Sequence, residues 1–149
     1  MLIVMSDLHL ADSGSYNLNG RRYNHNLPSE VYSSFFKEIS EFIRDSEIES
    51  IDLVLAGDIF EITRSALWHD GQLRPYLHND EIAEGSEAEA MLLRVMDSIT
   101  NDERVDATLS IFRRLSAFYQ KPVTLHFIPG NHDRLVNASQ AVRTRVQSL

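Results

Sequence analysis

Three short apolar segments, each followed at once by polar residues, set the pattern of this chain. They are Leu2–Met5, Ile51–Ala56 and residues 122–128. Short, largely apolar runs of this kind are typical of strands that are buried on both faces of a parallel sheet. The pattern therefore predicts three parallel strands, with covering layers on both sides of the sheet.

The residues between the first two predicted strands have the periodicity of a helix. Pro28 and Ser29 are typical of a helix start. An apolar stripe follows at helical spacing, with further apolar residues beside it. The stripe is Val31, Phe35, Ile39 and Phe42, and its neighbours are Tyr32, Phe36 and Ile43. Strand, helix and strand in this order predict a right-handed βαβ unit and an α/β fold.

The second half of the chain adds more helices before the third predicted strand. Ser86 and Glu89 have the spacing of a capping box, which predicts a helix start. Asn101 is expected to cap another helix. The buried stripe of that helix is predicted to be Val105, Leu109, Phe112, Leu115 and Phe118. A last helix is expected directly after Asp133, and residues from about 62 to 106 are interpreted as a helical insertion.

Length and composition describe one soluble globular domain. The chain has 149 residues, 43% of them hydrophobic and 24% charged, and no cysteine. Any metal must therefore bind to His, Asp, Asn or Glu. The chain opens without a signal-peptide pattern or a membrane-spanning run, so a cytoplasmic location is expected. The formal net charge of -8 makes nucleic acid a less favoured partner.

Polar side chains of several kinds follow the three apolar segments. Asp7 and His9 come after the first, Asp58 after the second, and Asn131-His132-Asp133 after the third. The carboxyl ends of parallel strands meet at one edge of a sheet, where ligands bind in open α/β folds. Carboxylates, imidazoles and an amide oxygen suit a pair of divalent cations such as Mn, Fe, Zn or Mg.

The order of these clusters carries a family resemblance. Asp7-Leu8-His9, then Gly57-Asp58-Ile59-Phe60-Glu61, then Gly130-Asn131-His132-Asp133 resembles the calcineurin-like metallophosphoesterases. The resemblance implies one half of a two-sheet αββα sandwich and a dinuclear metal centre. Glu61 belongs to the matching motif but is not predicted to be a metal ligand.

The resemblance also implies a role for each residue. Asp7 and His9 would hold the first metal, Asp58 would bridge both metals, and Asn131 would bind the second. His132 would give a proton to the leaving group, and Asp133 would hold the His132 ring. Two cations about 3.5–4 Å apart need a shared anionic ligand, and a water between them loses a proton near neutral pH.

Part of the family pattern is absent from this chain. The family continues with a lone His and a Gly-His-x-His element that complete both metal shells, and no histidine follows His132 here. We therefore interpret the chain as the amino-terminal half of such an enzyme, truncated at its carboxyl end. Alone, this half is expected to bind metal weakly, to hydrolyse slowly and to self-associate through an uncovered sheet face.

The predicted function is metal-dependent hydrolysis of a phosphate mono- or diester, with a phosphorylated small molecule or a nucleotide-like substrate. The alternatives are a nuclease of the same superfamily and a catalytically silent phosphoesterase-like module that binds a partner. Several arginines near the clusters are interpreted as surface charges, of which one could bind a substrate phosphate. These are Arg21, Arg22, Arg64 and Arg134.

Overall fold

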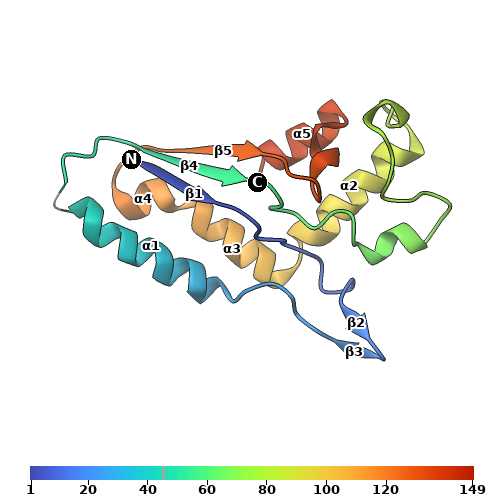
Figure 1. Cartoon of the computed structure of the whole chain (residues 1–149), viewed down its shortest axis with the longest axis horizontal. Coiled ribbons are helices and arrows are strands. Elements are labelled where there is room, and N and C mark those ends of the chain that lie inside the picture. Colours follow the sequence, from blue (N-terminus) through green and yellow to red (C-terminus); the bar gives the residue numbers. More distant parts are fainter. Residues whose placement is uncertain (45) are drawn as a thin grey trace.

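A three-stranded parallel sheet forms the centre of the fold. The computed structural model describes residues 1–44 and 46–149. The sheet has the order β1 (Leu2–Met5), β4 (Ile51–Ala56) and β5 (Val123–Ile128), so β4 lies in the middle (Figure 1). A small antiparallel pair, β2 (Asn17–Leu18) and β3 (Arg21–Arg22), lies apart from it. The predicted α/β class with three parallel strands is confirmed.

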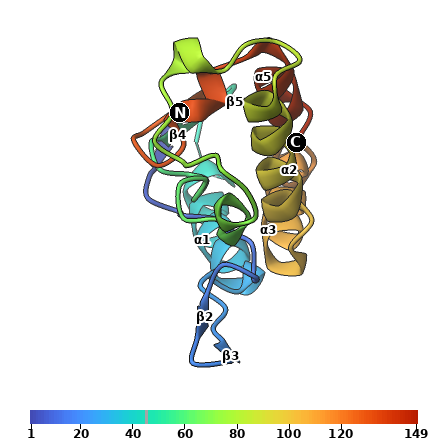
Figure 2. The ribbon, with the colours of Figure 1, turned by 90° about the vertical axis from the view of Figure 1, so that its right-hand side faces the viewer.

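The described residues form five helices, which leave one face of this sheet open. They are α1 (Ser29–Arg44), α2 (Glu87–Thr100), α3 (Glu103–Arg113), α4 (Leu115–Tyr119) and α5 (Gln140–Gln147), with 3₁₀ turns at Ala66–His69, Asn79–Glu81 and Arg134–Asn137. Figures 1 and 2 show α1 and α3 together on one side of the strands, while α2 packs against α5. Within the described ranges, no helix is long and apolar enough to cross a membrane.

The strands are buried on one face rather than on both, and the uncovered sheet face that we expected is present. Ile51 and Leu53 point to the helices and are buried. On the opposite face Leu2 is 65% exposed, Val4 57% and Ile128 56%. Side chains alternate between the two faces of a strand, and in this chain helices cover only one of them. The sheet therefore has one packed face and one open apolar face.

The buried stripe of α1 also differs from the predicted one. The buried side chains are Tyr32, Phe36 and Ile43. Val31 is 48% exposed and Phe42 is 77% exposed. The rings of Tyr32 and Phe36 meet the Phe112 ring of α3 edge-on, with centroids 6.0 and 5.8 Å apart. The apolar arc of α1 is wider than the surface that α3 covers, so the contact with α3 decides which edge of the arc is buried.

The helix boundaries after residue 100 correct two further predictions. Asp102, not Asn101, caps α3, and its carboxylate accepts two backbone N–H groups at 3.1 and 3.4 Å. Asn101 instead ends α2. The predicted single helix is divided at Arg114 into α3 and α4, which leaves Phe118 exposed. Asn and Asp cap helices about equally well, so the sequence did not separate these two neighbouring residues.

The last helix begins later than predicted. A 3₁₀ turn follows Asp133, and Ser139 then caps α5 by accepting the backbone N–H of Val142 at 3.1 Å. Val142 is fully buried. The chain thus turns sharply after Asp133 before α5 packs against α2.

We expect the open sheet face to drive self-association, because monomeric proteins rarely leave a large apolar patch in water. Light scattering over a range of protein concentrations should show a mass above that of a monomer. Val4→Lys, which places a charge on the open face at the edge strand β1, should shift the protein to a monomer. Phe42→Lys on α1 serves as the control and should leave the association unchanged. A wild-type monomer at every concentration would contradict the prediction.

Candidate active site

Two chain segments that follow β1 and β4 run side by side and build the candidate site. The backbone N–H of Asp7 donates to the carbonyl of Gly57 at 3.2 Å, and that of His9 donates to the carbonyl of Asp58 at 2.9 Å. Further along, the N–H of Glu61 donates to the carbonyl of Leu10 at 2.9 Å. These bonds bring the side chains that follow β1 and β4 together at one edge of the sheet.

Three residues of the site have backbone dihedral angles in the left-handed region. The φ angles are 57° at Asp7, 47° at His9 and 51° at Asp58. This conformation costs about 1–2 kcal/mol per residue, although Asp, Asn and His tolerate it better than most residues. Residues held in such conformations cluster at functional sites, where the surrounding structure fixes them.

The same three residues form a group that could bind a cation. One ligand atom each from Asp7, His9 and Asp58 lies within 4.8 Å of the other two. His9 and Asp58 are partly buried, and Asp7 is exposed, so the group lies at the surface. Two carboxylates and one imidazole match the ligands that Mn, Fe or Zn prefers. The structure thus brings together three of the four residues that we predicted as metal ligands.

Asn131, the fourth predicted ligand, is exposed and directly precedes His132 in the turn after β5. The backbone N–H of His132 donates to Oδ1 of Asp58 at 2.9 Å. This bond ties the turn after β5 to the turn after β4, and it leaves the other carboxylate oxygen of Asp58 for a cation.

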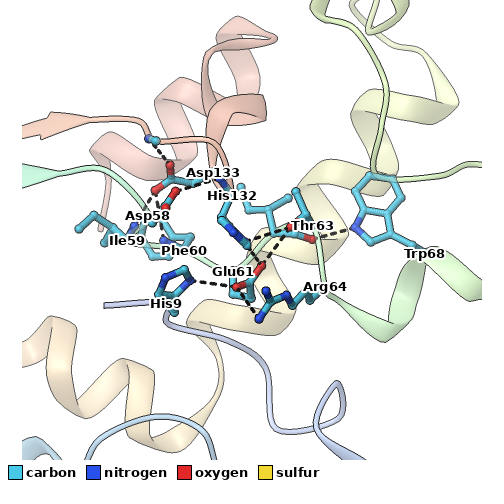
Figure 3. A network of polar contacts seen from close by, with 12 residues as sticks. His9, Asp58, Ile59, Phe60, Glu61, Thr63, Arg64, Trp68, His132 and Asp133 are labelled. Atoms are coloured by element: carbon cyan, nitrogen blue, oxygen red, sulfur yellow. Dashed lines mark hydrogen bonds and ion pairs between the residues drawn. The ribbon is translucent and has the colours of Figure 1, made fainter. Parts of the chain in front are cut away.

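A buried carboxylate, Glu61, connects the two imidazoles of the site (Figure 3). Its Oε2 lies 2.9 Å from Nδ1 of His9, and its Oε1 lies 2.7 Å from Nδ1 of His132. The hydroxyl of Thr63 donates to the same Oε1 at 3.0 Å. The Glu61 side chain is fully buried, and the centroids of the two imidazole rings are 4.9 Å apart.

The surroundings of Glu61 favour its charged form. Burial raises the pKa of Glu61, but the hydrogen bonds with His132, His9 and Thr63 outweigh this effect, and the pKa lies below its ordinary value. A carboxylate that accepts several hydrogen bonds holds its partners in a fixed orientation. Glu61 therefore engages Nδ1 of both imidazoles and leaves Nε2 of each free of this contact, so that Nε2 could bind a cation or a substrate.

Glu61 and His132 also fall within a second group that could hold a cation together with His9. Both oxygens of Glu61 already accept hydrogen bonds from the imidazoles, and the carboxylate is shielded from solvent. The group of Asp7, His9 and Asp58 is open to solvent, so it is the better candidate cation site.

Asp133 does not have the role that we predicted for it. Its Oδ2 accepts the backbone N–H groups of Ile59 and Phe60 at 2.8 and 3.2 Å, and its Oδ1 accepts that of Gly130 at 2.6 Å. Glu61, rather than Asp133, holds the His132 ring. The carboxylate of Asp133 points back to the strand ends, so it fixes the backbone of the site.

The environment of Asp133 is consistent with a structural role. The residue is fully buried. Burial raises the pKa of Asp133, and the charge of Asp58 adds to this effect, while the three backbone N–H groups partly oppose it. The carboxylate satisfies donors that two separate turns would otherwise leave unpaired.

Sequence reasoning missed the contribution of Glu61 and Thr63. Two signals in the sequence point to Glu61. It lies between the apolar residues Phe60 and Ile62, which marks a buried charge, and it belongs to the Gly-Asp-x-x-Glu motif. A buried carboxylate needs hydrogen-bond donors, and the nearby histidines are the natural ones. Thr63 had no such signal.

Gly130 allows the turns after β4 and β5 to approach each other. A Cβ atom on Gly130 would lie 2.5 Å from the backbone nitrogen of Asp58 and closer still to its Oδ1. We expect Gly130→Ala to lower the free energy of unfolding by about 1–3 kcal/mol, because the backbone must shift. The variant should also bind Mn²⁺ more weakly, since Asp58 moves.

Urea denaturation and metal titration would test the Gly130→Ala variant. Gly71→Ala is the matched control, because a Cβ atom on Gly71 meets nothing within 4 Å. The control should change the free energy of unfolding by less than about 0.5 kcal/mol. Equal effects of the two substitutions would show that the close approach at Gly130 is unimportant.

Other residues considered from the sequence lie outside this cluster. His126 is on the open sheet face, where its Nε2 lies 2.8 Å from Oδ1 of Asp52. Arg134 donates to the carbonyl of Leu77 at 2.7 Å. Arg21 is exposed on β3, and the side chain of Arg22 lies outside the described part of the structure. Arg64 alone of these arginines has a contact with the cluster among the described residues.

Comparisons of the chain with models of protein families, with curated proteins and with solved structures gave no match.

Proposed function

We propose that this chain is a metal-dependent phosphoesterase of the calcineurin-like type. The observation that carries the proposal is the adjacency of two groups at one sheet edge. Asp7, His9 and Asp58 form a candidate cation site, and His9 shares the Glu61 carboxylate with His132. The order of the three sequence motifs supports the same proposal.

The donor set fits hard or borderline divalent cations. The carboxylates of Asp7 and Asp58 and Nε2 of His9 would hold the first cation, and Asn131 with Asp58 would hold a second. When bound, such cations polarise a phosphoryl oxygen and lower the pKa of a water ligand. Glu61 fixes the His9 ring from Nδ1, which is how proteins commonly orient an imidazole ligand.

His132 is well placed to serve as the proton donor. Its Nδ1 is engaged by Glu61, so a protonated ring keeps the N–H of Nε2 for a substrate. In hydrolysis a water oxygen forms a bond to phosphorus, and the bond from phosphorus to the ester oxygen breaks. The departing oxygen takes the proton of Nε2, and the imidazole later regains one from the attacking water. The products are an alcohol and a phosphate.

The test is the hydrolysis of nitrophenyl phosphate by the full chain with Mn, Fe, Zn or Mg, and with a chelator. We expect slow hydrolysis with at least one of these cations and its loss on chelation. Hydrolysis that persists in the chelator, or none with any of the four cations, would contradict the proposal. Thermal unfolding in parallel would show whether the chain stays folded when the metal is removed.

A further inference from the structure

Arg64 places a positive charge at the edge of the candidate site. Its Nη1 lies 3.8 Å from Oε2 of Glu61, the same oxygen that contacts Nδ1 of His9 at 2.9 Å. Figure 3 shows the guanidinium beside the Glu61 carboxylate. The Arg64 side chain is 62% exposed, whereas that of Glu61 is fully buried. The guanidinium therefore lies beside a buried carboxylate of the site and is accessible from solvent.

The contact with Glu61 does not use a donor of Arg64. At 3.8 Å the nitrogen is beyond hydrogen-bond distance, so the interaction is electrostatic. A guanidinium presents several N–H groups in one plane, which match two oxygens of a phosphate. Arg64 can hence bind a phosphate without breaking a hydrogen bond to Glu61.

The charge around the site makes such a cation important. The site contains three carboxylates. Those of Asp7 and Asp58 are grouped with His9, and that of Glu61 contacts His9 and His132. A phosphate group that approaches these carboxylates is repelled unless positive charge is nearby. Divalent cations would offset part of this repulsion, and Arg64 offers a further positive charge.

We propose that Arg64 binds the terminal phosphoryl oxygens of the substrate and makes the site selective for phosphomonoesters over phosphodiesters. This inference rests on the proposed function. A monoester phosphate has a second pKa near 6, so at neutral pH it carries close to two negative charges on three terminal oxygens. A diester carries one charge on two such oxygens, and therefore gains less from a guanidinium. The preference distinguishes a phosphatase from a nuclease.

The experiment compares nitrophenyl phosphate with bis-nitrophenyl phosphate as substrates of the Mn²⁺-loaded chain. Arg64→Ala should lower kcat/KM for the monoester by about 10- to 100-fold and for the diester by a clearly smaller factor. Arg64→Lys should restore part of the loss, because charge remains but paired donors do not. An equal loss for both esters, or no loss, would overturn the inference.

Arg94 offers a matched control. Its side chain is 58% exposed and also pairs with one carboxylate, that of Asp70 at 3.1 Å. Arg94→Ala should leave both kcat/KM values unchanged. If it lowers them as much as Arg64→Ala does, the effect comes from the net charge of the protein rather than from Arg64.

A binding measurement separates this inference from the proposed function. Calorimetric titration with inorganic phosphate should give a Kd that is at least about tenfold higher for Arg64→Ala than for the wild type, and unchanged for Arg94→Ala. If turnover depends on metal but the Kd for phosphate is the same in Arg64→Ala and in the wild type, only the Arg64 assignment fails. If the wild type shows no metal-dependent turnover, the proposed function fails, and the phosphate Kd still decides whether Arg64 binds phosphate.

Discussion

Asp58→Asn should abolish metal-dependent hydrolysis while the protein stays folded. The substitution removes one negative charge from the candidate cation site but keeps Oδ1, which accepts the backbone N–H of His132. Bound cations supply several kcal/mol of charge stabilisation in phosphoryl transfer, so we expect kcat/KM to fall by about 10³-fold or more. Calorimetric titration should show weaker Mn²⁺ binding by the same variant.

Asp52→Asn is the control for this experiment. Asp52 lies on the same strand, β4, and its carboxylate pairs with His126 on the open face of the sheet. Its substitution should leave hydrolysis and Mn²⁺ affinity unchanged. Circular dichroism should confirm that both variants are folded. Wild-type turnover in folded Asp58→Asn would show that hydrolysis does not need the Asp58 carboxylate.

His132→Ala should lower turnover and leave the amount of bound metal nearly unchanged. A positioned general acid contributes roughly 10²–10⁴-fold, so the loss should fall in this range for an alkyl phosphate. The loss should be smaller for nitrophenyl phosphate, because a good leaving group needs little protonation. The measurements are kcat for both esters and the metal content of each variant.

His126→Ala provides the comparison, since His126 is also paired with a carboxylate at a similar distance but lies on the sheet face. It should keep wild-type kcat for both esters. If His132→Ala instead loses metal in proportion to activity, His132 is a ligand, and the group of His9, Glu61 and His132 is the cation site.

The sequence predicted the architecture well where the physical signal was local. The apolar segments identified all three strands of the parallel sheet, because a strand in a core is a short run of apolar residues that can be recognised in the sequence. The clusters after these strands could be assigned to one edge from topology alone. Asp7, His9 and Asp58 do lie together at that edge.

The strand residues themselves do not show which surfaces are covered, and the open sheet face was expected only from the missing part of the family pattern. Leu2 and Val4 are apolar whether or not a layer packs on them, and their exposure depends on where the helices lie. The same limit applies to α1, where seven apolar positions form one wide arc and only its contact with α3 selects the buried edge.

The sequence also could not predict which groups pair with the carboxylates of the site. Asp133 and Glu61 are both close in sequence to other site residues, and either could have paired with the His132 ring. The three-dimensional turn after β5 directs Asp133 to backbone N–H groups of the turns, and leaves Glu61 to the imidazoles. Such a choice between two carboxylates depends on the backbone path, which spacing does not reveal.

The central claim is that Asp7, His9 and Asp58 hold a divalent cation. Pulsed electron paramagnetic resonance of the Mn²⁺-loaded chain tests it most directly, because a coordinated imidazole nitrogen modulates the electron spin echo. We predict nitrogen modulation in the wild type, its loss in His9→Gln and its persistence in His126→Gln. A wild-type signal without nitrogen modulation, or modulation that survives His9→Gln, would contradict the claim.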